Sequence, residues 1–102
     1  MYYLLRMSWT HDEVLAAVRS VIQEHTDTTA DLSEKTELVA DLGIDSLGVM
    51  EVVAEIEDKF DMTIADSELR EVSTLGDVVQ AIEGRLRQEG RLTAAARKGA
   101  DG

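Results

Sequence analysis

The sequence predicts an all-α fold, a small four-helix bundle in which three longer helices and one short helix are joined by a long, ordered first loop. Three observations lead to this fold class. Apolar residues recur at helical spacing in three separate segments. Each of these segments follows a residue that can cap a helix. No segment shows the sustained alternation of apolar and polar residues that indicates a strand. The length of 102 residues suits one domain with a modest core.

The first helix is predicted from about Thr10 to His25. Thr10 and Glu13 have the spacing of a capping box, and Trp9 and Val14 have the spacing of a hydrophobic staple. Apolar residues at a helical period follow, so this segment has one face that can pack against a core.

A long connection rich in threonine, serine and aspartate follows the first helix. These residue types compete with helical hydrogen bonding, so the segment is predicted to be a loop with at most one helical turn. Loops of this length in compact domains are often functional. Five apolar side chains are expected to hold it against the core: Leu32, Leu38, Val39, Leu42 and Ile44.

The second helix is predicted from about Ser46 to Asp61, with Asp45 as its N-cap. At about 100° per residue, one stripe of this helix is apolar and is expected to face the core. The stripe consists of Val49, Val53, Ile56 and Phe60. The outer face combines acidic and exposed apolar residues, namely Leu47, Met50, Glu51, Ala54, Glu55 and Asp58.

Two further helices complete the bundle. A short helical turn is expected at about Asp66–Glu71, and a last helix is expected from about Leu75 to Gln88, where Thr74 and Asp77 resemble a helix start. The helical domain therefore spans residues 10–88. Residues 1–9 are assigned to an N-terminal extension and residues 89–102 to a flexible tail.

Composition restricts the class of function. The formal net charge is −11, from 21 acidic and 10 basic residues. This charge argues against binding to nucleic acid and favours partners that present lysine and arginine. Cysteine is absent, which excludes a cysteine nucleophile and a thiolate metal site. No apolar run is long enough to predict a membrane span, and a cytoplasmic location is expected.

A calcium-binding loop is not predicted. Asp41, Asp45 and Glu51 lie close in sequence, but an EF-hand needs glycine at its sixth position and glutamate at its twelfth. Counted from Asp41, these positions hold Ser46 and Val52. We therefore assign no metal site.

Ser46 is the candidate functional residue. It falls at the start of the second helix, where unpaired backbone N–H groups and the helix dipole favour a phosphate. A nucleophilic serine needs a neighbouring base, and the only histidines, His11 and His25, are assigned to the two ends of the first helix. Ser46 is therefore either a plain polar residue of a first helical turn or a site that another enzyme modifies.

The stretch "DLGIDSLGVMEVVAEIEDKFDMTIADSEL" resembles the acyl carrier proteins of fatty acid and polyketide synthesis. The core of the match is "LGIDSL", supported by the downstream "EIEDKF" and by "IAD". The resemblance covers about Thr10 to Gln88. Gly48 departs from it, because a polar or acidic residue is more usual there.

The resemblance implies a role for each matching residue. Ser46 would carry 4′-phosphopantetheine donated by coenzyme A, with Asp45 and Leu47 beside it. The residues implied to dock onto basic patches of partner enzymes, together with their outer-face neighbours, are Leu47, Met50, Glu51, Ala54, Glu57 and Asp58. The residues expected to line an acyl cleft are Val53, Ile56, Phe60, Ile64 and Leu69.

The resulting hypothesis is a freestanding, monomeric acyl carrier protein with no catalysis of its own. Its partners would be a holo-carrier-protein synthase (a phosphopantetheinyl transferase) and acyl-loading and acyl-processing enzymes of fatty acid, lipid or polyketide biosynthesis. One alternative is an aminoacyl, peptidyl or D-alanyl carrier protein. An alternative of a different class is an acidic helical adaptor that never receives a cofactor.

Overall fold

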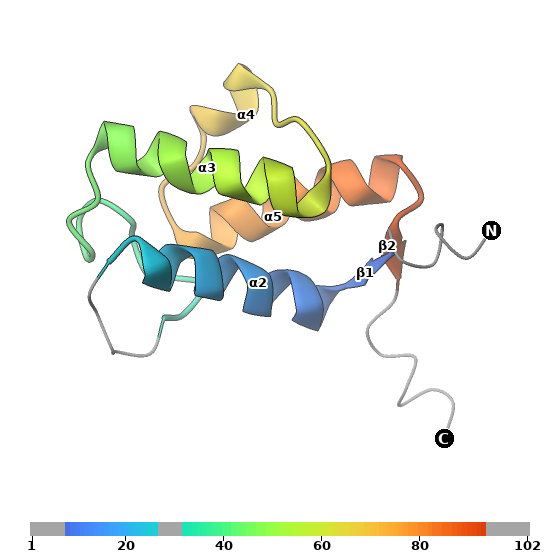
Figure 1. The fold of residues 1–102 in the computed structure, drawn as a ribbon, viewed down its shortest axis with the longest axis horizontal. Coiled ribbons are helices and arrows are strands. Elements are labelled where there is room, and N and C mark those ends of the chain that lie inside the picture. Colours follow the sequence, from blue (N-terminus) through green and yellow to red (C-terminus); the bar gives the residue numbers. More distant parts are fainter. Residues whose placement is uncertain (1–7, 27–31, 94–102) are drawn as a thin grey trace.

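The computed structural model describes residues 8–26 and 32–93. In chain order, its elements are β1 (Trp9–Thr10), α2 (His11–Glu24), α3 (Ser46–Phe60), α4 (Asp66–Leu69), α5 (Leu75–Gln88) and β2 (Leu92–Thr93). Figure 1 shows that α2, α3 and α5 form the body of the bundle, with α4 beside α3 on the side away from α2. The predicted fold class is confirmed: there are three longer helices and one short helix in this part of the chain. Within the described ranges, no helix has the length and apolar character needed to cross a membrane.

The capping residues predicted for α2 and α5 are confirmed. The Thr10 side chain accepts a hydrogen bond from the Glu13 backbone N–H, and the Glu13 carboxylate accepts one from the Thr10 backbone N–H in return. Thr74 and Asp77 form the same reciprocal pair at α5. Hydrogen bonds from the backbone N–H groups of Thr74 and then Ser73 hold the pKa of Asp77 below its usual value.

The short helix α4 ends earlier than predicted. It spans Asp66–Leu69, not Asp66–Glu71. The following residues bond three positions back, Glu71 N–H to the Glu68 carbonyl and Val72 N–H to the Leu69 carbonyl. This tighter pattern does not continue an α-helix.

The core face of α3 is broader than the predicted stripe. Val53, Ile56 and Phe60 are buried as expected, but Val52 is also fully buried and was missed. Val49 packs against the core as predicted but is only half-buried. The reason is that the first turns of α3 face an open space beside α4, whereas the later turns are enclosed by the neighbouring helices.

The described part of the long connection packs onto the bundle through four of the five predicted anchors, which are Leu32, Leu38, Leu42 and Ile44. The prediction was wrong for Val39, which is 60% exposed, and Leu42 is half-buried. A turn closed by the hydrogen bond from Ile44 N–H to the Leu38 carbonyl, 3.0 Å long, directs Leu38 inward and its neighbour Val39 outward. The part of this connection formed by residues 27–31 lies outside the described residues.

The same connection also caps the start of α5. The Leu75 N–H donates to the Thr36 carbonyl and the Gly76 N–H donates to the Glu34 carbonyl, each at 2.9 Å. These carbonyls satisfy N–H groups that have no partner within the helix. A Cβ atom at Gly76 would lie 2.8 Å from the Glu34 carbonyl oxygen, so this close approach requires glycine.

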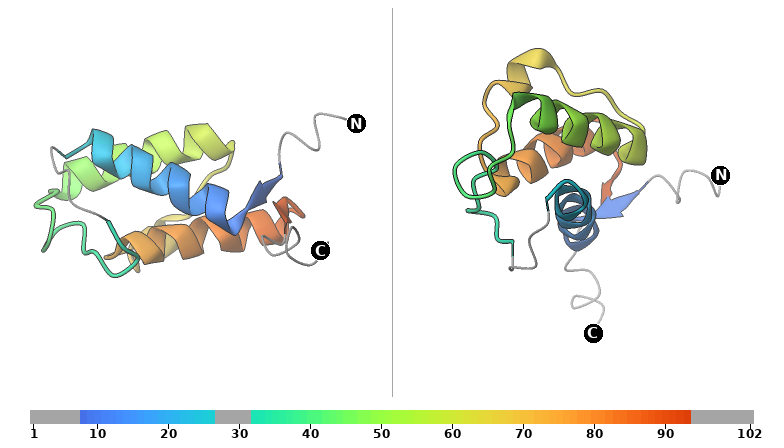
Figure 2. Two further views of the ribbon diagram at one scale, coloured as in Figure 1. Left: turned by 90° about the horizontal axis from the view of Figure 1, so that it is seen from below. Right: turned by 60° about the vertical axis from the view of Figure 1, so that its left-hand side comes forward.

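A pair of short parallel strands joins the two ends of the described chain. Trp9 of β1 is in register with Leu92 of β2, and the Trp9 N–H donates to the Arg91 carbonyl at 2.8 Å. Figure 2 shows this pair at one end of the bundle. Residues 89–93 were assigned to a flexible tail, but these contacts make them part of the fold. The remainder of both predicted extensions lies outside the described residues.

Arg91 also connects this strand pair to α3. Its guanidinium donates hydrogen bonds to the carbonyls of Phe60 and of Asp61, the latter at 3.3 Å, and it pairs with the Glu89 carboxylate at 2.7 Å. The last carbonyls of a helix have no intrahelical partner, and the helix dipole places negative charge there. Arg91 therefore caps the C-terminal end of α3.

Candidate functional site

Ser46 is the first residue of α3 and lies at the end of the bundle opposite the strand pair (Figure 1). It is exposed, and its hydroxyl has no hydrogen-bond partner within the described ranges. The first backbone N–H groups of a helix point outward without intrahelical partners, and the dipole gives this end partial positive charge. The hydroxyl is thus accessible and lies where an attached phosphate would be stabilised.

The turn that precedes Ser46 is held by Asp45. The Asp45 carboxylate accepts a hydrogen bond from the Gly48 N–H at 2.8 Å, as expected of an N-cap. A Cβ atom at Gly48 would lie 2.7 Å from the Cγ2 methyl of Ile44 and 3.2 Å from Asp45 Oδ1. This crowding gives a physical reason for the glycine, because a larger residue would displace Ile44 or the cap.

Neither histidine pairs with Ser46. The His25 imidazole hydrogen-bonds the Glu55 carboxylate, and the His11 imidazole hydrogen-bonds the Glu83 carboxylate. Within the described ranges, neither histidine therefore gives Ser46 the neighbouring base that a nucleophilic serine requires. Among the described residues, no group of three or more histidine, aspartate or glutamate side chains lies close enough to hold a metal ion.

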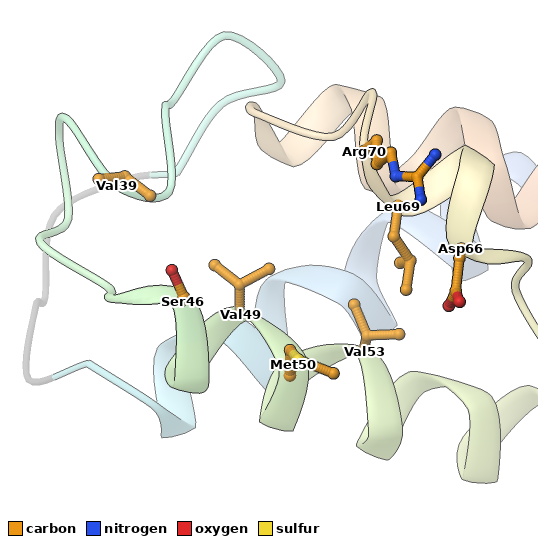
Figure 3. A pocket seen from close by; sticks show the side chains of 8 residues that line it. All are labelled: Val39, Ser46, Val49, Met50, Val53, Asp66, Leu69 and Arg70. Carbon is orange, nitrogen blue, oxygen red and sulfur yellow. The ribbon is translucent and has the colours of Figure 1, made fainter.

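A cavity of about 460 Å³ opens between α3, α4 and the long connection, within the size range of ligand pockets. Its lining residues are Val39, Ser46, Val49, Met50, Val53, Asp66, Leu69 and Arg70. Figure 3 shows Ser46 toward one side of the cavity and Asp66 and Arg70 toward the other, with Val49, Met50 and Val53 between them.

The cavity contains only two of the five residues expected to line a cleft. Val53 and Leu69 line it, whereas Ile56, Phe60 and Ile64 are buried in the core and do not. The periodicity of α3 groups all inward residues together, but the structure divides them between the core and the cavity. Val49 lies four residues before Val53 on the same face of α3, and this spacing is the sequence feature that could have identified it as a lining residue. Nothing in the sequence pointed to Val39 or Arg70, because loop conformation brings them there.

The residues expected to dock onto partners lie mostly on the surface. Leu47 is 67% exposed and Met50 is 62% exposed, which is unusual for such large apolar side chains. Glu51, Ala54 and Asp58 are also exposed.

Glu57 differs from the other residues expected to dock. It is half-buried, and its carboxylate accepts a hydrogen bond from the Ile64 backbone N–H at 2.8 Å. This bond ties the connection after α3 to the helix, so Glu57 has a structural task that the sequence did not reveal.

Comparison with protein families finds one matching model, described as a phosphopantetheine attachment site, over residues 12–82. An acyl carrier protein of an Exiguobacterium species is 42% identical over 82 residues, which cover 76% of this chain and 99% of that protein. A meromycolate extension acyl carrier protein of Mycolicibacterium smegmatis is 35% identical over 91 residues, covering 88% of this chain and 91% of that protein.

A solved structure gives the same result for the fold. A chain from Mycobacterium tuberculosis described as an acyl carrier protein superposes with a TM-score of 0.66 at 31% sequence identity. The superposition covers 69% of this chain and 95% of the other.

Proposed function

This chain belongs to the acyl carrier protein family, and on that premise we propose that Ser46 receives its 4′-phosphopantetheine arm. Proteins of this family are carriers, not enzymes, and they work with a synthase and with acyl-processing enzymes. The arm, when attached, supplies a thiol that holds acyl groups as thioesters. The chain itself has no cysteine, so the cofactor supplies the only thiol.

The observation that carries this proposal is the position of the Ser46 hydroxyl. It is exposed at the N-terminal end of a 15-residue helix and borders an apolar cavity. The phosphate of the arm fits this position because helix N-termini stabilise anions. The adjacent Asp45 carboxylate accepts a hydrogen bond from the Gly48 N–H and leaves the Ser46 hydroxyl accessible.

The outer face of α3 supports the proposed docking of basic partner enzymes. Leu47 and Met50 offer apolar anchors, and Glu51 and Asp58 lie on the same exposed surface as a charged rim. Interfaces combine such anchors with complementary charge. Exposed charges are screened by salt, so docking should weaken as ionic strength rises. Affinity for a partner enzyme that is equal at low and high salt would contradict this part of the proposal.

The cavity supports an acyl cargo over an aminoacyl one. Its walls are formed largely by Val49, Met50, Val53 and Leu69, which suit an alkyl chain. We propose a role in fatty acid, lipid or polyketide biosynthesis, and we keep the cytoplasmic location and the monomeric state as predictions. Intact mass of the protein purified from its own host, with the thioester preserved, would identify the cargo. An aminoacyl mass would favour the alternative carrier.

The attachment site is tested by incubating the apo-protein with coenzyme A and a phosphopantetheinyl transferase. We expect the intact mass to increase by one phosphopantetheinyl group in the wild type. Ser46→Ala should show no increase, whereas Ser20→Ala, which removes an exposed hydroxyl of α2, should behave as the wild type. A wild-type protein that stays unmodified would favour the helical adaptor. A mass increase in Ser46→Ala would place the arm elsewhere.

A further inference from the structure

His25 links the end of α2 to the outer face of α3. Its Nε2 atom lies 2.5 Å from Glu55 Oε1, and its Nδ1 atom lies 3.8 Å from Glu51 Oε1. The imidazole is only 22% exposed, although the carboxylates are 48% and 58% exposed respectively. One imidazole thus lies against two acids of the helix that carries the proposed docking surface.

Within the described ranges, the ion pairs that this imidazole makes are with acidic residues alone. Glu51 and Glu55 face it from α3, and the exposed Glu24 precedes it on its own helix. The C-terminal carbonyls of α2 add the negative end of the helix dipole, and the last turn of α2 contains no basic residue. Among the described residues, no lysine or arginine pairs with Glu51 or Glu55. The side chain that can pair with them as a cation is His25 in its protonated form.

We propose that His25 is a proton-dependent competitor built into the partner-docking surface. In its protonated form it neutralises Glu51 and Glu55 and reduces the attraction of this face for lysine and arginine. In its neutral form it leaves both carboxylates with their full charge. The inference rests on the proposed function, since docking is what gives these acids their use.

The direction of the effect follows from charge alone. Histidine side chains change charge between about pH 5 and 8, whereas lysine and exposed glutamate stay charged over most of this range. A basic partner therefore competes with the imidazole only where the imidazole is protonated, which is toward the acidic end of this range. His25 acts as a positioning residue, because it works through Glu51 and Glu55 and not on the cofactor.

His11 provides an internal comparison. Its imidazole pairs with Glu83 of α5, and its Nε2 atom lies 3.8 Å from Glu34 Oε2 in the long connection. Neither carboxylate belongs to α3. A substitution of His11 removes an imidazole and its ion pairs, as a substitution of His25 would, but it leaves the acids of the docking face unchanged.

The test uses a lysine-rich peptide as the basic probe, because its side chains do not titrate between about pH 6 and 8. Binding to the apo-protein is followed by the amide NMR signals of α3 at low ionic strength. We expect the wild type to bind about two- to fivefold more weakly at about pH 6 than at about pH 8. His25→Gln should lose this pH dependence, and His11→Gln should keep it.

Glu55→Gln provides a second variant that does not alter α2. It removes the carboxylate nearest to the imidazole, so it should also reduce the pH dependence. The proposal is overturned if His25→Gln titrates like the wild type, if the wild type shows no pH dependence, or if the peptide does not perturb α3. This assay needs no cofactor, so its failure is distinguishable from failure of Ser46 to accept phosphopantetheine, which the mass measurement reports.

Discussion

Arg91→Ala should destabilise the bundle although it changes a residue beyond the last helix and outside the matched family region. The guanidinium of Arg91 donates to the carbonyls of Phe60 and Asp61 at the C-terminal end of α3, and only 11% of the side chain is exposed. Alanine keeps the backbone bond to Trp9 but removes these donors. The change therefore leaves the strand pairing in place while it removes the cap and the ion pair with Glu89.

The magnitude follows from the contacts that are lost. A hydrogen bond to a charged group contributes about 1.5–3 kcal/mol, and a cation at a helix C-terminus contributes roughly 0.3–1 kcal/mol. The contact with the Asp61 carbonyl is long at 3.3 Å, and Asp61 is exposed, so water can replace part of it. We therefore expect a loss of about 2 kcal/mol in the free energy of unfolding. For a domain of this size, that loss lowers the melting temperature by roughly 10 °C.

Urea unfolding followed by tryptophan fluorescence measures this loss. Trp9 is the only tryptophan, and its ring lies 4.3 Å from that of Phe60, centroid to centroid, so its emission should report the integrity of this end of the bundle. Arg87→Ala is the matched control: it removes the same charge from an exposed position in the last turn of α5. It should cost only a few tenths of a kcal/mol. If Arg91→Ala were no more destabilising than Arg87→Ala, the capping role would be refuted.

Three further predictions use the same unfolding measurement. Asp77→Asn should have a lower free energy of unfolding than the wild type at neutral pH. Because folding lowers the pKa of Asp77, its carboxylate stabilises the folded state above the ordinary pKa of aspartate. The difference in the free energy of unfolding should vanish in acid, below the pKa of the folded state. A gap that persists there would contradict this assignment. Gly76→Ala should destabilise the bundle, because the added methyl group would clash with a loop carbonyl. Gly84→Ala adds a methyl group in the middle of α5 where no atom is close, so it should stabilise the bundle by about 0.5–1 kcal/mol. Equal effects of the two substitutions would contradict the close approach at Gly76. Val52→Ala should lower the free energy of unfolding by about 2 kcal/mol and Val49→Ala by clearly less, because only Val52 is fully buried. The reverse order would contradict this description of the core.

The helix starts were predictable because their causes are local. Thr10 and Thr74 each bond to a residue three positions later, and Asp45 does the same at α3. Such interactions are visible in a sequence, and they located the start of α3 at Ser46. The identity of the candidate site was therefore available before the structure.

The surroundings of the site were less predictable. A helical period identifies which side of α3 faces inward but not what covers it, so it could not separate the cavity residue Val49 from the core residue Val52. It also did not show that the loop turns Val39 outward or that Glu57 is tied to Ile64. Each of these depends on the path of the chain between helices.

The sequence by itself determined the helical fold class, the capped starts of the helices and the exposed serine at the head of the acidic helix. These features arise from interactions within one or two turns. Only the tertiary structure decided that His25 contacts Glu55 and that Arg91 caps α3, since these partners lie about 30 residues apart in the chain. No local pattern encodes such contacts, because they exist only after packing has brought separate segments together.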